Sequence, residues 1–250
     1  MLYQRSALVF DAEGGPLSGL SLSLISLGLS PHYSADLDEL VLLSREYRSQ
    51  VGAILVPADV VEERLRGLIE RIVEPLGLSA AAVVPVGASP DPEKLDSLAE
   101  CGLRWALWRP FEAPDLRFVV AQVLSNSDPE ELRVHARIPC SIPAQVESPL
   151  RQAAVVLTDL SQGGCFARLA EPFASGTRIR LHFALDELRV TLVTRVTWTT
   201  GPGTPEWHEN GMGIEFLEMD DGARAQLARH VDERVWRYRV STDRKRRANA

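Results

Sequence analysis

The sequence has 250 residues, 45% of them hydrophobic and 24% charged, a composition typical of globular proteins and long enough for two small domains. No apolar run reaches the ~18 residues that span a bilayer, the first residues do not form a signal peptide, and the three cysteines lack the spacing of a zinc site or a disulfide framework. We therefore expect a cytoplasmic protein without a metal or a cofactor.

The net charge of −7 is unevenly distributed along the chain. Residues 1–124 hold 10 Lys and Arg against 17 Asp and Glu, whereas residues 125–250 hold 17 of each kind. The acidic first half argues against nucleic acid as its partner. The neutral second half can still bind an anion locally.

Residues 1–124 alternate strand-like and helix-like stretches. Apolar runs typical of buried strands occur at 7–10, 51–56 and 81–86, and helical stretches at 17–27, 60–74, 92–101 and 115–124. Short strands that alternate with helices predict a parallel sheet covered by helices on both faces. We assign this first domain to residues 1–124.

Turn-forming residues at 125–129 end this pattern, and from residue 138 onward apolar residues alternate with polar ones. The alternation predicts an antiparallel sheet that closes into a small barrel, with inward rows at 138–146, 179–185 and 190–198. Trp198 ends the last row, so we expect it to pack in the barrel, with a partner-binding patch as the alternative. We assign 125–137 to a linker, 138–237 to the barrel with a final helix that Asp220 and Asp221 cap, and 238–250 to a basic tail.

Two short motifs flank the first inward row. Arg133 and Arg137 precede it, and the segment Asp159-Leu-Ser161-Gln-Gly-Gly164 follows it. Arginines supply forked donors for phosphates and planes that stack on bases, and a carboxylate accepts the paired N–H donors of a guanine edge. A charged linker followed by an Asx-turn at a hairpin is the alternative interpretation.

The pair of motifs resembles the PilZ domain family, whose pattern is RxxxR before the first barrel strand and [D/N]xSxxG at the following hairpin. The resemblance covers about residues 132–236 and implies a six-stranded antiparallel barrel with a C-terminal helix. It implies that cyclic di-GMP is the ligand. It also implies that Arg133 and Arg137 clamp phosphate and stack on guanine, that Asp159 and Ser161 hold a guanine edge, and that Gly164 keeps the turn open.

The first domain resembles the receiver domain of response regulators, a flavodoxin-like α/β/α sandwich. Residues 8–13 look like its acidic first strand, and Arg109-Pro110-Phe111 like its Lys-Pro-Phe corner. The acceptor aspartate is missing, because Pro57 stands at the end of the third apolar run, and Gly87 stands where Ser or Thr is expected. We interpret this domain as a pseudo-receiver that docks another protein, with Asp11 as a surface acid rather than a metal ligand.

No nucleophile, metalloprotease or nucleotide-loop motif occurs, so we expect no enzyme and no catalytic residues. The favoured function is a cyclic di-GMP receptor that couples ligand binding to protein–protein interaction, in bacterial motility, pilus, polarity or exopolysaccharide control, and the protein is a candidate homodimer. The alternative is a structural adaptor with a vestigial site that does not bind cyclic di-GMP.

Overall fold

The computed structural model describes residues 5–12, 14–125, 137–185, 188–201 and 210–240. They form two compact units. The first unit comprises Met1–Leu132 together with Trp236–Ala250, and the second unit comprises Arg133–Val235. The second unit is therefore an insertion in the first, and the chain passes between them twice.

The first unit contains a parallel sheet of five strands in the order β2-β1-β3-β4-β5. This is the flavodoxin-like strand order, which confirms the predicted fold class. Three of the strands coincide with the apolar runs of the sequence, whereas β2 and β5 were not predicted. The strands are β1 (Arg5–Phe10), β2 (Leu29–Ser34), β3 (Val51–Pro57), β4 (Val83–Gly87) and β5 (Leu107–Trp108).

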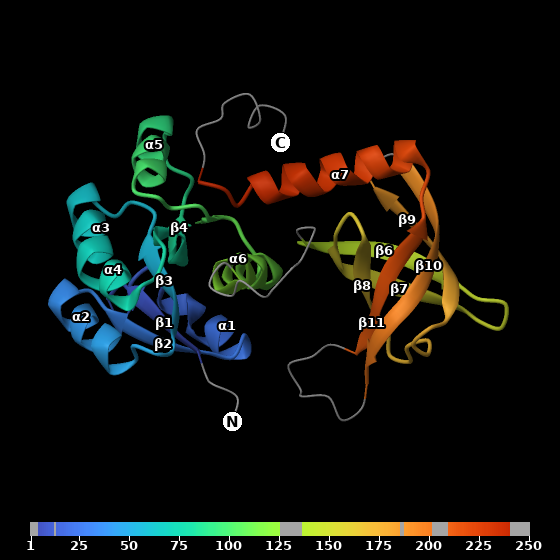
Figure 1. The fold of residues 1–250 in the computed structure, drawn as a ribbon, viewed down its shortest axis with the longest axis horizontal. Helices are drawn as coiled ribbons and strands as arrows, with labels where there is room; N and C mark the ends of the chain where they lie inside the picture. The colour runs from blue at the N-terminus through green and yellow to red at the C-terminus, as the bar shows by residue number, and fades with distance from the viewer. Residues whose placement is uncertain (1–4, 13, 126–136, 186–187, 202–209, 241–250) are drawn as a thin grey trace. The chain divides into compact units, whose positions relative to one another are not determined.

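Helices pack on both faces of this sheet (Figure 1). Buried residues of the strands and of α2, α3 and α5 make one hydrophobic cluster, to which Leu8, Ile54 and Leu68 contribute fully buried side chains. The helical elements are η1 (Ser18–Leu20), α1 (Ser21–Ser26), α2 (Leu37–Glu46), α3 (Glu62–Leu68), η2 (Ile69–Val73), α4 (Glu74–Leu76), η3 (Ala80–Ala82), α5 (Pro92–Glu100) and α6 (Ala113–Ser125).

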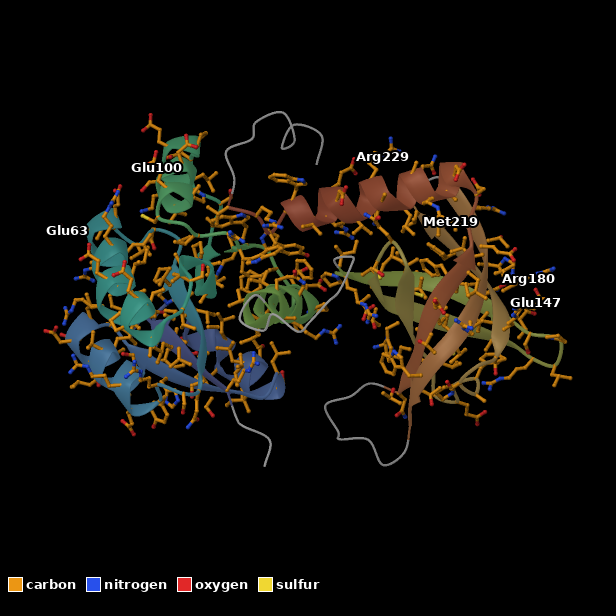
Figure 2. All side chains as sticks on the ribbon, in the orientation of Figure 1. Glu63, Glu100, Glu147, Arg180, Met219 and Arg229 are labelled. Carbon is orange, nitrogen blue, oxygen red and sulfur yellow. The ribbon has the colours of Figure 1, made fainter. Side chains whose placement is uncertain are left out.

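The surface of the first unit carries the acidic residues that the composition indicated. Glu63 on α3 and Glu100 on α5 point away from the sheet (Figure 2), and both are exposed. Glu62 accepts two hydrogen bonds from Arg66 one turn later, at 2.7 and 2.9 Å. Such an exposed pair contributes little to stability.

The second unit is a closed antiparallel barrel in the order β10-β11-β8-β7-β6-β9, which confirms the predicted barrel. Ile179, Leu181, Phe183 and Leu185 are all buried, as the alternation predicted. Among the described residues no helix is long and apolar enough to cross a membrane. The strands are β6 (Ile138–Glu147), β7 (Gln152–Leu160), β8 (Gly164–Arg168), β9 (Arg178–Leu185), β10 (Leu188–Thr200) and β11 (Gly211–Glu218).

The prediction that Trp198 packs inside the barrel is wrong. The pairing of β10 with β11 shifts between Val196 and Trp198, so Thr197 is an extra residue. A bulge of this kind turns the following side chain to the other face of the strand. Val196 is fully buried, whereas Trp198 lies on the outer face with 42% of its surface exposed.

The final helix, α7 (Asp221–Trp236), begins where the sequence predicted. The Asp220 carboxylate accepts a hydrogen bond from the Ala223 amide at 2.9 Å, which caps the helix. Leu227 and Val231 are its buried residues. Beyond α7, residues 238–240, which the sequence analysis placed in the basic tail, belong to the first unit.

Candidate functional site

The second motif and the end of the first lie at one end of three neighbouring strands. Arg137 directly precedes β6, whose Pro139 pairs with Asp159 of β7. Asp159 pairs on its other side with Phe166 of β8. We call this end of β6, β7 and β8 the motif corner; it contains Arg137, Asp159, Ser161 and Gly164. Arg133 lies outside the described residues.

Ser161 and Gly164 close the turn between β7 and β8. The Ser161 hydroxyl and amide both donate to the Gly164 carbonyl, at 2.9 and 2.8 Å, and Ser161 is buried. A Cβ at Gly164 would lie 2.2 Å from the Ile214 carbonyl oxygen of β11. Residue 164 must therefore be glycine, because the backbone of the neighbouring strand β11 leaves no space for a side chain. In this structure the Ser161 hydroxyl donates to the turn itself.

Asp159 faces outward because of a second bulge, between Leu157 and Asp159. Leu157 points into the barrel and is fully buried, whereas Asp159 is half-buried. One oxygen of its carboxylate accepts a hydrogen bond from the Phe166 amide at 3.1 Å. This bond fixes the orientation of the carboxylate at the barrel surface.

The charged groups of the motif corner affect the pKa values of two nearby thiols, Cys140 and Cys165. Burial raises the pKa of Cys140 to about 12, with the Asp159 carboxylate adding to the effect and Arg234 of α7 opposing it. Burial also raises the pKa of Cys165, again reinforced by Asp159 and opposed by Arg137. Two cations and a carboxylate therefore act on one pair of neighbouring thiols. The sequence analysis missed Arg234, which no motif marks.

An aromatic pair extends the outer face beyond Asp159. Phe166 pairs with Gly213 of β11, and Gly213 pairs with Trp198. The rings of Phe166 and Trp198 stack with their centroids 5.2 Å apart, and a Cβ at Gly213 would lie 2.2 Å from the indole nitrogen. The absence of a side chain at Gly213 therefore lets the exposed indole lie flat across β11.

A hollow of about 1130 Å³ lies on the barrel away from the corner, and none of the corner residues lines it. Pro143, Ala154 and Val156 are among the apolar residues that line it, and Arg168 and His182 are among the polar ones. Near its edge Glu147 and Arg180 are paired across β6 and β9 (Figure 2). The candidate site rests on the chemistry of the corner rather than on the size of this hollow.

The first unit has its own corner at the carboxyl ends of its strands, a hollow of about 800 Å³ that includes Pro57, Gly87 and Arg109. The Arg109 guanidinium donates to the Pro16 carbonyl at 2.7 Å. A Cβ at Gly87 would lie 2.9 Å from the Cβ of Ala58, so a larger residue there needs the neighbour to move. Within the described ranges no group of three or more His, Cys, Asp or Glu side chains could hold a metal ion.

The interpretation of Asp11 as a surface acid is wrong. Asp11 is buried, and its carboxylate accepts hydrogen bonds from the Ala12 and Leu17 amides at 2.9 and 2.6 Å. A Cβ at Gly15 would lie 2.2 Å from the same carboxylate. Asp11 therefore holds the loop after β1 in place through one hydrogen bond to each carboxylate oxygen.

Residues 131–233 match the family model described as PilZ domain. This match confirms that the second predicted domain, which carries both motifs, resembles the PilZ family. Comparison with curated proteins finds no match. The chain therefore contains a PilZ-type barrel, and the sequence match covers less than half of its length.

Solved structures similar to parts of the chain include the inhibitor of motility MotI/DgrA from Bacillus subtilis (20% identity, 43% of this chain and 52% of that chain, TM-score 0.38). They also include YcgR in complex with c-di-GMP from Escherichia coli (20% identity, 40% and 45%, TM-score 0.35). The chain spans about half the length of these two proteins. A response regulator receiver domain protein from Clostridium thermocellum is similar to the other part of the chain (16% identity, 49% and 96%, TM-score 0.41).

Proposed function

We propose that the second unit binds cyclic di-GMP at the motif corner, and that the chain is a non-enzymatic receptor that passes this signal to a protein partner through the first unit. The observation that carries the proposal is the placement of Arg137, Asp159 and the Ser161–Gly164 turn at one end of β6, β7 and β8. The match of residues 131–233 to the PilZ family supports it.

The corner supplies the donors and acceptors that such a ligand needs. Arg137 is exposed and offers a planar fork for a phosphate or a base, as does Arg133 by its sequence position. The Asp159 carboxylate accepts from the N1 and N2 donors of guanine. Ser161 and Gly164 keep the turn tight, so that the ligand approaches the backbone closely.

The exposed Trp198 indole supplies a stacking surface on the same face. Asp159 pairs with Phe166, Phe166 with Gly213, and Gly213 with Trp198, so the four residues form one row across β7, β8, β11 and β10. The indole offers an aromatic plane to a second guanine. Base–aromatic stacking contributes about 1–3 kcal/mol. Trp198→Ala is therefore expected to weaken binding several-fold or more while leaving the buried core unchanged.

Isothermal calorimetry with cyclic di-GMP tests the proposal. The wild-type chain should bind at micromolar ligand or below, and Asp159→Ala should weaken binding at least tenfold, since a charge-assisted contact contributes about 1.5–3 kcal/mol. Asp59→Ala, an exposed acid of the first unit, is the matched control and should leave the affinity unchanged. Absence of binding heat for the wild-type chain would reject the proposal.

A second candidate function is a structural adaptor whose site is vestigial. The observation that favours it is the internal use of both polar side chains: Ser161 bonds to Gly164, and Asp159 to the Phe166 amide. The same titration decides between the two functions, because the adaptor predicts no nucleotide binding. Motility, pilus, polarity or exopolysaccharide control stays the proposed setting of either function, and a homodimer stays a proposal for both.

A further inference from the structure

The first unit receives a short strand from the far end of the chain. Trp105 and Arg239 form an antiparallel bridge. The Ala106 amide donates to the Tyr238 carbonyl at 2.8 Å, and the Val240 amide donates to the Arg104 carbonyl at 3.1 Å. These contacts lie directly before β5, which is the last strand of the sheet. We call residues 238–240 the docked segment.

Side-chain contacts also hold the docked segment in place. The Tyr238 ring lies 4.8 Å from the Phe118 ring of α6, and its hydroxyl donates to the Asp115 carboxylate. Tyr238 and Val240 are both buried, and Val240 joins the core of the first unit. We call the surface formed by Trp105, Asp115 and Phe118 the seat. It binds an aromatic hydroxyl, and an aliphatic side chain two residues later packs into the core beside it.

The residue between them is seated on the face of an indole. The Arg239 guanidinium lies 4.0 Å from the centre of the Trp105 ring, which is a favourable cation–π contact. Trp105 is itself buried and meets the edge of Phe118 at 5.9 Å. The first unit thus contacts three successive side chains of an extended peptide: a tyrosine, a cationic residue and an aliphatic residue.

Two features oppose this docking. The pKa of Arg239 is lowered, mainly because the guanidinium is partly buried and also because Arg104 places a like charge nearby. The indole N–H of Trp105 is buried and has no acceptor among the residues that the structure describes. A buried donor without an acceptor costs free energy, so the docked segment fits its seat imperfectly.

We propose that this edge of the first unit is the surface on which the chain binds an extended segment of a protein partner, and that residues 238–240 are an internal occupant that must leave first. The proposal rests on the proposed function in that it assigns the partner to the first unit. The partner segment runs antiparallel to residues 104–106 and presents tyrosine, a cationic side chain and an aliphatic side chain. It also supplies an acceptor to the Trp105 N–H.

The internal segment competes because it is part of the same chain. A tethered segment acts at an effective concentration of the order of millimolar, so weak contacts suffice to keep the seat filled. The partner must therefore bind more tightly than the chain's own three residues, or another event must first free them. The docked segment follows directly after α7 along the chain, because α7 ends at Trp236, two residues before Tyr238.

The test uses the full chain and a synthetic peptide of residues 236–240 at millimolar concentration, followed by NMR. Tyr238→Ala should empty the seat: the Ala106 amide should exchange at least tenfold faster, and the peptide should bind this variant at least tenfold more tightly than the wild-type chain. A peptide with alanine in place of Tyr238 is the matched control and should not bind. Equal peptide affinity for both chains, or no binding to the Tyr238→Ala chain, would overturn the proposal.

Arg104→Gln provides an independent arm on an exposed residue, which is useful if Tyr238→Ala does not fold. Removing the like charge beside Arg239 should slow Ala106 exchange several-fold and weaken peptide binding further. Unchanged exchange would show that Arg104 does not oppose docking and would refute the imperfect fit. None of these measurements contains cyclic di-GMP, so they succeed or fail independently of nucleotide binding.

Discussion

The corners of the two units each contain an aspartate near a strand end, and the two aspartates have opposite environments. Asp11 is buried and bonded to two amides of its own loop, whereas Asp159 is half-buried and turned outward by a bulge. Arg109 in the first corner bonds to a backbone carbonyl, and Arg137 in the second is exposed. The comparison teaches that strand pairing and local hydrogen bonds, more than position near a strand end, decide whether an acid faces its own loop or the protein surface.

The units also differ in their thiols, and this difference gives the largest expected effect. Burial raises the pKa of Cys140 to about 12, and it also raises the pKa of the buried Cys165. The pKa of Cys101 in the first unit is raised too, mainly by burial, and a nearby Arg66 opposes the effect. Since only the thiolate reacts, Cys101 should be alkylated faster at pH 8 than either Cys140 or Cys165.

Timed iodoacetamide labelling followed by peptide mass spectrometry measures the three rates. The expected order is Cys101, then Cys140, then Cys165. Labelling of Cys140 as fast as Cys101 under native conditions would mean that the barrel beneath the motif corner is open to solvent. The thiols of the two units would then not differ in their access to solvent.

The second prediction compares the arginines of the two corners. Arg137→Ala should weaken cyclic di-GMP binding by about ten- to a hundredfold, because it removes a charge-assisted contact to phosphate. Arg109→Ala removes the same charge from the first unit and should leave the affinity unchanged. Calorimetry on both variants makes the measurement. Equal losses would indicate a general charge effect rather than a site at the motif corner.

The third prediction concerns the internal role of Asp11. Asp11→Asn keeps the shape of the side chain but weakens its bonds to the Ala12 and Leu17 amides, at an expected cost of about 1–3 kcal/mol in unfolding free energy. Asp59→Asn is the exposed control, with an expected change within about 0.5 kcal/mol. Urea unfolding measures both. An unchanged unfolding free energy for Asp11→Asn would show that these two hydrogen bonds do not stabilise the first unit.

The sequence predicted the fold classes because hydrophobic period is a local property. Period two placed Ile179, Leu181 and Phe183 inside the barrel, and long apolar runs located β1, β3 and β4. β2 was not predicted, because its LSPHYS sequence contains proline and few apolar residues. β5 was not predicted either, since two residues carry no period.

The features missed at the site depend on strand pairing rather than on local sequence. Trp198 was assigned to the core because a bulge shifts the inward row without any change in composition. Arg234 acts on Cys140 from a helix far along the chain. The docked segment was grouped with a basic tail, since its burial depends on Trp105 and Phe118 of another region. Motif spacing located the candidate residues, and their availability had to come from the structure.

The last prediction expects no change: acetyl phosphate with Mg²⁺ should leave the mass of the intact protein unaltered. Phosphoryl transfer to a receiver needs an accessible carboxylate at the end of the third strand and acids that hold the metal. Pro57 ends β3, and Asp11 is committed to its loop. Asp59 is exposed two residues beyond β3, and it is the acid that most directly challenges the prediction.

A phosphoryl group mapped to Asp59 would show that the loop after β3 reaches into the hollow it borders, and the first corner would then be a chemical site after all. A receiver that retains the acceptor aspartate is the positive control for the reagent. A Pro57→Asp variant sharpens the result, because it places a carboxylate at the strand end without supplying the further acids that hold the metal. If this variant also stays unmodified, the missing metal ligands are sufficient to silence the first corner.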